Sequence, residues 1–162
     1  MLKQLALATM LFCMAACSGT TRFNGSADGT YRIDGQNAKL AYVFIVKEEP
    51  WDGKPTFTFI FSEKDATAAQ RVGSIVNSKT YGSVLTLTAY KDPKTGDYHV
   101  INNAFQHPAL KTPGANGTGT VFLKNMSEAN NELAGQAYTN PNSTLFNQTI
   151  DIDLKFKAPL PK

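Results

Sequence analysis

Carboxylates at alternate positions near the C-terminus are the first residues of this chain that could do chemistry. Asp151 and Asp153 share one face of a segment with strand-like alternation, which places them about 7 Å apart. Two carboxyl groups at that separation could act as acid and base on a glycoside. Glu48 and Glu49 form a second acidic pair. Alternate lysines, however, continue the face that carries Asp151, and this mixed charged ladder is typical of an exposed strand. We therefore predict a solvated surface rather than a catalytic pair.

The histidines and cysteines add no catalytic pattern. His99 falls in an expected strand and His107 in an expected loop, and their spacing matches no standard metal site. The chain contains no motif of a serine hydrolase, a zinc peptidase or a phosphate-binding loop. These residues therefore predict a protein that has no metal ion and no cofactor and that is not an enzyme.

Trp51 is the one tryptophan of the chain, and it lies in a polar segment with Glu48, Glu49 and Lys54. Exposed aromatic side chains among charged neighbours are typical anchors of protein interfaces. These four residues therefore form the candidate binding loop. The alternative is that Trp51 folds back and closes one end of the core. The sequence leaves both interpretations open.

Residues 1–16 differ in kind from the rest of the chain. Lys3 gives them a positive start, and residues 5–14 carry no charge. Ten residues at about 1.5 Å each cannot cross a hydrocarbon core of about 30 Å. A charged start, a short apolar core and a run of small residues predict a secretory signal that is removed from the mature protein.

The small residues at the end of this signal are Met14-Ala15-Ala16-Cys17, followed by Ser18. They resemble the lipobox of bacterial lipoproteins, although Met14 stands where that family usually has leucine. The resemblance implies that Cys17 receives a diacylglycerol, that a lipoprotein signal peptidase cuts before it, and that the new amine is acylated. Ser18 lacks the aspartate of an inner-membrane retention signal, so the implied address is the outer membrane of the cell envelope.

The predicted organisation is a signal peptide over residues 1–16, a lipidated flexible tether over residues 17–28 and one β domain over residues 29–162. The tether is small and polar, as flexible linkers are. The formal net charge of the chain is only +3, which predicts no nucleic-acid partner and no polybasic attachment to a membrane. Since Cys13 leaves with the signal and Cys17 is acylated, the domain is expected to fold without a disulfide.

Alternation of apolar and polar residues dominates the domain, and it is cleanest over residues 145–157, where the even-numbered apolar positions begin with Phe146. Asp34 and Gly35 mark a tight hairpin turn, and residues 92–96 mark a second turn that ends on glycine. Residues 39–46 are apolar without alternation, which indicates a central strand that is covered on both faces.

Residues 62–70 form the one expected helix, with Ser62 as its cap. Strands are expected over residues 31–33, 39–46, 56–61, 82–90, 97–102, 118–124, 132–139 and 145–157. The pattern predicts an all-β fold, either an antiparallel β-sandwich or a small β-barrel of about eight strands.

A small lipidated β domain without catalytic groups is expected to bind or support another molecule. The first hypothesis is a non-catalytic accessory, inhibitor or immunity-type protein with a protein partner in the envelope. The second is an envelope hydrolase, whose two acidic pairs must then converge in a cleft. The third is a carrier of a small apolar ligand inside a barrel. A core filled by Phe57, Phe59, Phe61 and Phe156 would exclude this third hypothesis.

Overall fold

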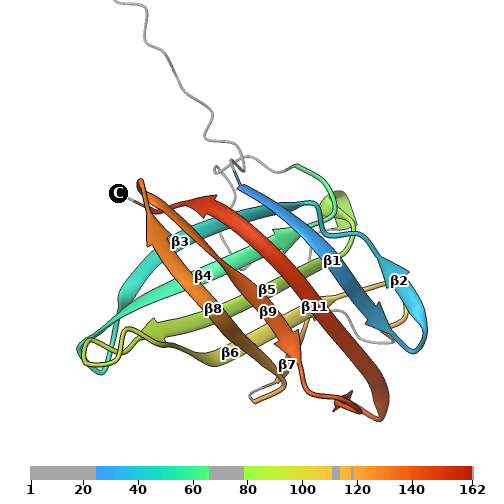
Figure 1. Ribbon diagram of the computed structural model, residues 1–162. Coiled ribbons are helices and arrows are strands. Elements are labelled where there is room, and N and C mark those ends of the chain that lie inside the picture. Colours follow the sequence, from blue (N-terminus) through green and yellow to red (C-terminus); the bar gives the residue numbers. More distant parts are fainter. Residues whose placement is uncertain (1–24, 66–78, 111–113, 118, 162) are drawn as a thin grey trace, which may run out of the picture.

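The computed structural model describes residues 25–65, 79–110, 114–117 and 119–161 (Figure 1). Nearly all of the described chain is β-structure, and one antiparallel sheet joins its strands. Cys17 lies outside the described residues, so the signal and the lipid anchor stay predictions. No helix in the described ranges has the length and the apolar character needed to cross a membrane.

The strands follow one another around a nearly closed barrel (Figure 1). Their bounds are Gly25–Ile33 (β1), Gln36–Ala38 (β2), Tyr42–Trp51 (β3), Lys54–Ser62 (β4), Val84–Lys91 (β5), Tyr98–Gln106 (β6), Ala115–Gly117 (β7), Val121–Ala129 (β8), Glu132–Thr139 (β9), Thr144–Leu145 (β10) and Gln148–Pro159 (β11). The main strands have the order β6-β5-β4-β3-β1-β11-β9-β8, with β7 beside β6, β2 beside β1 and β10 beside β11. The predicted all-β class, antiparallel pairing and eight main strands are confirmed, and the shape is the barrel.

The barrel stays open between β6 and β8. These strands lie side by side, but no backbone ladder joins them in the described part of the chain. Side chains bridge this seam instead. The Lys91 ammonium donates to a carboxylate oxygen of Glu128 at 2.7 Å, and the Tyr98 hydroxyl donates to the same oxygen at 2.6 Å. These bonds lower the pKa of Glu128, while burial and the nearby carboxylate raise the pKa of Tyr98.

Alternation along β11 builds one wall of the core, as predicted. Its even-numbered positions from Ile150 to Phe156 are buried, and the residues between them are exposed. The Phe156 ring packs edge-on against Phe59 and Phe61 of β4, with 5.6 and 5.3 Å between ring centroids. Phe57 is half-buried against the same cluster. Aromatic rings from both sides therefore meet in the middle of the barrel.

β3 has apolar side chains on both faces, which confirms the prediction from its unbroken apolar sequence. Val43 and Ile45 are buried in the barrel interior. Tyr42, Phe44 and Val46 lie on the opposite face of the strand, where they pack against a second cluster. That cluster contains Ile60, Tyr81, Val84 and Ala104. The sheet is therefore covered on its outer side as well, from β3 to β6.

The first hairpin turn is as predicted, but its return strand is not. Asp34 and Gly35 adopt φ values of 46° and 76°, as a tight two-residue turn requires. The strand that returns is the short β2, which ends at Ala38. The strand expected over residues 39–46 begins instead at Tyr42, and it pairs mainly with β4. The apolar run correctly predicted a strand here, but it did not predict which strand would pair with it.

The segment around Trp51 was expected to be a loop, and this expectation is wrong. β3 continues to Trp51 and turns at Asp52 and Gly53, which have φ values of 50° and 69°. β8 turns in the same way at Asn130 and Asn131, with φ values of 53° and 60°. Turns of this kind need positive φ at both central positions, which Asp, Asn and Gly adopt most readily. The polar residues beside these turns are therefore strand positions rather than loop positions.

Two further boundaries differ from the prediction. Residues 25–28, expected as the end of the tether, form the first half of β1, and residues 26–28 pair with β11. Their small side chains give little strand signal, yet their backbone completes the ladder. The expected helix fails at its start, since Ser62 belongs to β4, and the part from residue 66 onward lies outside the described residues. The described helical structure is one 3₁₀ turn, Lys79–Tyr81.

Phe146 was expected on the buried face of the last strand, and this expectation is also wrong. It lies in the turn between β10 and β11 with a φ of 51°, followed by Asn147 at 63°. Its exposed fraction is 66%. Phe146 continues the apolar pattern of the sequence, but the strand begins only at Gln148, after a two-residue turn. A bulky residue at positive φ is an uncommon and strained choice.

Candidate functional site

Trp51 is exposed and is held by neighbouring rings. Its exposed fraction is 47% and it belongs to neither core cluster, so the interpretation in which it closes the core is wrong. The indole stacks on Tyr90 with 5.1 Å between ring centroids, and Tyr90 stacks on His99 at 5.0 Å. The Lys54 ammonium lies 4.4 Å from the Tyr90 centroid and 5.4 Å from that of Trp51. We call Trp51, Tyr90, His99 and Lys54 the aromatic row.

Strand register brings the aromatic row together on the outer face of the barrel. Tyr90 on β5 pairs directly with His99 on β6 and with Thr56 on β4. The backbone N–H of Trp51 donates to the Thr56 hydroxyl oxygen at 2.9 Å. The predicted turn over residues 92–96 joins β5 to β6, and its first and last residues form a backbone hydrogen bond of 2.8 Å. The residues of the aromatic row therefore belong to paired strands rather than to a loop.

The two glutamates of the predicted binding loop do not belong to the aromatic row. Glu48 is half-buried on β3 opposite Thr56, and Glu49 is exposed where the register between β3 and β4 shifts. None of the ion pairs formed within the described ranges involves either glutamate. Of the predicted binding loop, only Trp51 and Lys54 therefore belong to the aromatic row. Its other members, Tyr90 and His99, were not predicted to lie near the tryptophan.

The two acidic pairs do not converge. Asp151 and Asp153 lie on the outer face of β11, whereas the two glutamates lie on β3, and β1 stands between these strands in the sheet. Asp151 pairs with Arg32 at 3.5 Å and leaves 52% of its side chain exposed, and Asp153 accepts a hydrogen bond from the Gln136 side chain. A catalytic carboxylic acid needs apolar surroundings that keep it protonated. The geometry therefore gives the hydrolase hypothesis no support.

The two histidines have opposite surroundings. His99 belongs to the aromatic row, whereas His107 has an exposed fraction of only 4% just after β6. The His107 Nδ1 accepts a hydrogen bond from the Ala109 N–H at 3.1 Å, and its ring lies edge-on to Tyr31 at 5.0 Å. Burial lowers the pKa of His107, and the charge of Glu63 opposes this effect in part. Within the described ranges, no three His, Cys, Asp or Glu side chains gather into a metal site.

His107 should make the stability of the domain depend on pH. Because its pKa is lower in the folded chain, the unfolded chain takes up the proton first as the pH falls below about 6.5, the ordinary histidine value. We expect the free energy of unfolding to decrease as the pH falls below about 6.5, and His107→Gln to flatten this slope. Urea titrations at stepped pH measure the effect, with His99→Gln as the exposed control. If His107→Gln shows the same slope as the wild type, the pH dependence of the stability comes from groups other than His107.

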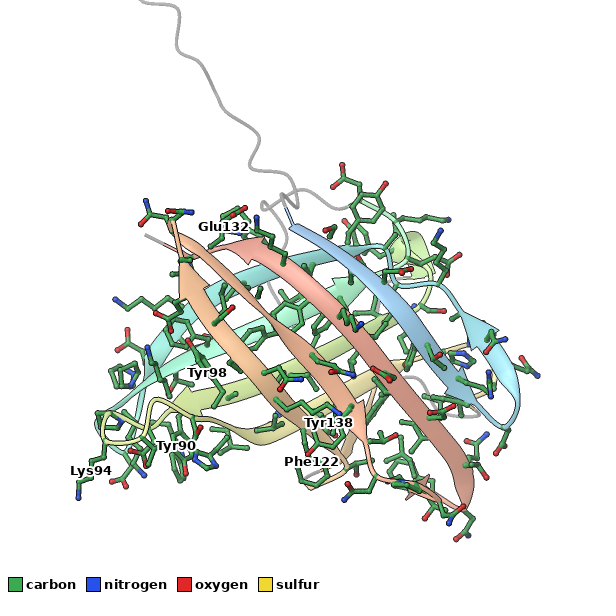
Figure 2. The ribbon with its side chains drawn as sticks, in the orientation of Figure 1. Tyr90, Lys94, Tyr98, Phe122, Glu132 and Tyr138 are labelled. Atoms are coloured by element: carbon green, nitrogen blue, oxygen red, sulfur yellow. The ribbon has the colours of Figure 1, made fainter. Side chains whose placement is uncertain are left out.

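Two hollows lie near the aromatic row, and His99 of the row lines the first of them. The seam hollow, of about 600 Å³, lies between the β5–β6 turn and β8. The β11 hollow, also of about 600 Å³, extends from β9 across β11 to the β1–β2 turn. Tyr138 and Lys124 line both of them. Phe122 packs beside Tyr138 at 5.7 Å between centroids, and the Lys124 ammonium lies 4.2 Å from the Tyr138 centroid. Figure 2 shows Phe122 and Tyr138 together at the lower centre, with Tyr90 to their left.

Sequence reasoning missed Tyr90, Phe122 and Tyr138 as surface residues. Each is an aromatic side chain at an outward position of an alternating strand, where the core does not need it. That alternation was the available signal, but only the pairing of the strands shows which outward rings become neighbours. Comparison with known proteins gave no family: no family model, no curated protein and no solved structure matches this chain.

Proposed function

We propose that this chain is a lipid-anchored protein of the bacterial envelope, and that it binds a protein partner without catalysing a reaction. The observation that supports this function best is the aromatic row. Its Trp51 is 47% exposed although it has a ring to stack on and a strand to hold it. Large rigid aromatic side chains supply much of the binding energy at protein interfaces. The row is therefore the contact surface of the proposed function.

The contacts that hold Trp51 in place favour binding as well. Tyr90 packs on one side of the indole, and the Thr56 hydroxyl holds its backbone N–H. Ordering a side chain at an interface costs about 0.5–1.5 kcal/mol when it is mobile in the free protein. In this protein the indole is already ordered by folding, so a partner meets a preformed surface.

The proposed location rests on the resemblance of residues 14–17 to a lipobox. A diacylglycerol on Cys17 would place the domain at a membrane, by default the outer membrane, on a short tether. Figure 1 shows β1 beginning at the top of the view, while the turn between β3 and β4 lies at the left. The β3–β4 turn beside Trp51 is thus apart from the end of β1 at which the predicted tether would join, so the tether would leave the aromatic row accessible to a partner.

The alternative functions have less support. A hydrolase would use converging carboxylates, whereas the acidic residues of β3 and β11 occupy separate strands of the outer surface. A carrier of an apolar ligand would need room inside the barrel, whereas Phe59, Phe61 and Phe156 pack against one another there. Neither alternative explains an exposed, preformed tryptophan.

Crosslinking in the envelope, followed by capture of the tagged protein, tests the proposal. We expect the wild-type protein to recover one dominant protein, and Trp51→Ala to reduce this recovery about tenfold or more, because central aromatic residues contribute about 2 kcal/mol or more. Phe146→Ala is the matched control, since Phe146 is an exposed aromatic residue at a different turn. Equal loss in both variants would indicate non-specific adhesion, and recovery of no partner by the wild type would contradict the proposal.

A further inference from the structure

The β11 hollow is built differently from the aromatic row. It is lined by β11 from Thr149 to Asp153 and by the turn of Asp34 and Gly35. The segment 139–142 also lines it. Its volume of about 600 Å³ lies within the range of about 300–1,000 Å³ that is usual for small-ligand sites. The hollow can therefore accept a ligand of several rings.

The carboxylates that line the β11 hollow already have partners within the protein. The partners are Arg32 for Asp151, the Gln136 side chain for Asp153, and the Thr149 N–H together with the Gln148 side chain for Asp34. The three carboxylates outnumber the two basic groups of the lining, Arg32 and Lys124. An anionic ligand would meet an excess of negative charge. The lining therefore disfavours an anionic ligand.

The remaining polar groups of the lining suit a ligand rich in hydroxyl groups. Asn140 and Asn142 are exposed at the rim of the hollow, and each side-chain amide can donate and accept hydrogen bonds. Charged side chains that are already paired, such as Asp151 with Arg32, still have lone pairs and N–H groups for further hydrogen bonds. Hydroxyl groups, which both donate and accept, match such a mixed lining.

Tyr138 adds an aromatic surface between the two hollows. Phe122 packs beside its ring and the Lys124 ammonium lies over it, so these neighbours fix its orientation. Tyr138 is half-buried, and the C–H groups of a sugar can pack against the part of its ring that stays exposed. The Lys124 ammonium over the ring can donate hydrogen bonds to the hydroxyl groups of the sugar. Beyond Tyr138 the seam hollow adds polar lining from Asp97 and Asn125.

We propose that the β11 hollow and the seam hollow together bind a neutral oligosaccharide that passes over Tyr138. Two hollows of about 600 Å³ each, which share Tyr138 and Lys124, fit a chain of sugar rings better than a single ring. This inference goes beyond the proposed protein partner and does not depend on it. His99 of the aromatic row lines the seam hollow, but Trp51 lines neither hollow.

The test uses the full-length chain, purified in mild detergent, on an array of neutral and anionic oligosaccharides, followed by titration of the best ligand. We expect neutral oligosaccharides to bind and anionic ones to be disfavoured. Tyr138→Ala should weaken binding about tenfold, which equals about 1.4 kcal/mol. Tyr138→Phe keeps the ring and should keep the affinity. Trp51→Ala should bind the sugar like the wild type, even though it loses the protein partner.

A second variant tests the inference even if Tyr138→Ala does not fold. Asn142 has a φ of 60°, which glycine adopts freely, so Asn142→Gly removes the amide without straining the turn. It should weaken sugar binding about fivefold, as the loss of one hydrogen bond predicts. Preference for anionic sugars, absence of binding to every neutral sugar, or unchanged affinity in both variants would overturn the inference. Any of these results together with normal partner capture would leave the proposed function standing.

Discussion

Gly29→Ala should prevent the barrel from folding stably, with a loss of about 4 kcal/mol or more in the free energy of unfolding. Gly29 lies in the middle of β1 with a φ of 134°, and a Cβ atom there would collide with the carbonyl oxygen of Asp153 on β11. The obstacle is backbone, so no side-chain rotation can relieve it. β1 and β11 pair along almost their whole length, and the added methyl group would force this ladder apart.

Gly35→Ala separates the clash from the effect of positive φ alone. Gly35 also has a positive φ, 76°, but a Cβ atom there would have no neighbour within 4 Å. Its replacement should therefore cost only about 1–2 kcal/mol. Urea denaturation of both variants measures the difference, and limited proteolysis replaces it if Gly29→Ala does not accumulate as a soluble protein. Equal stability of the two variants would contradict the proposed collision with β11.

Cys17→Ser should release the protein from the membrane and abolish its labelling with palmitate. The lipobox resemblance implies that acyl chains on this residue provide the attachment, and each buried CH₂ group contributes about 0.8 kcal/mol to membrane binding. A serine hydroxyl cannot take the thioether-linked lipid. We expect the variant to shift almost completely from the membrane fraction to the soluble fraction, or to remain as the uncut precursor.

Cys13→Ser is the matched control for this experiment. Cys13 belongs to the predicted signal and would be removed with it, so its loss should leave labelling, cleavage and membrane attachment unchanged. Cell fractionation with labelled palmitate measures all three variants together. Membrane retention of Cys17→Ser with normal processing would remove the lipid anchor from the proposed function. It would not affect the aromatic row as a binding surface.

The sequence predicted the fold where the signal was local. The alternation from Ile150 to Phe156 and the turn of Asp34 and Gly35 each depend on residues that are close together in the chain, and both are confirmed. It failed where a strand has no pattern of its own. Residues 26–28 form a strand because β11 pairs with them, and no composition rule assigns small polar residues to a ladder.

The candidate site was only partly predictable for the same reason. Trp51 could be singled out as the one tryptophan in polar surroundings, and its exposure agrees with a surface role. Its stacking on Tyr90, and the stacking of Tyr90 on His99, depend on how β4 registers against β5 and how β5 registers against β6. The pairing of Phe122 with Tyr138 depends likewise on the register of β8 and β9. Such registers are non-local, so residues of the site could be recognised in the sequence but their arrangement could not.

The open seam has a consequence for how this molecule behaves among copies of itself. An unclosed sheet leaves backbone groups on β6 and β8 to which another chain could add, as happens in fibrils. The β8 edge, however, has a register shift between Lys124 and Ser127, and Asn125 within it has a φ of 55°. A bulge and a lysine on an edge strand both obstruct regular pairing with a second molecule. Even when crowded together, such molecules would keep their incomplete barrels separate instead of polymerising edge to edge.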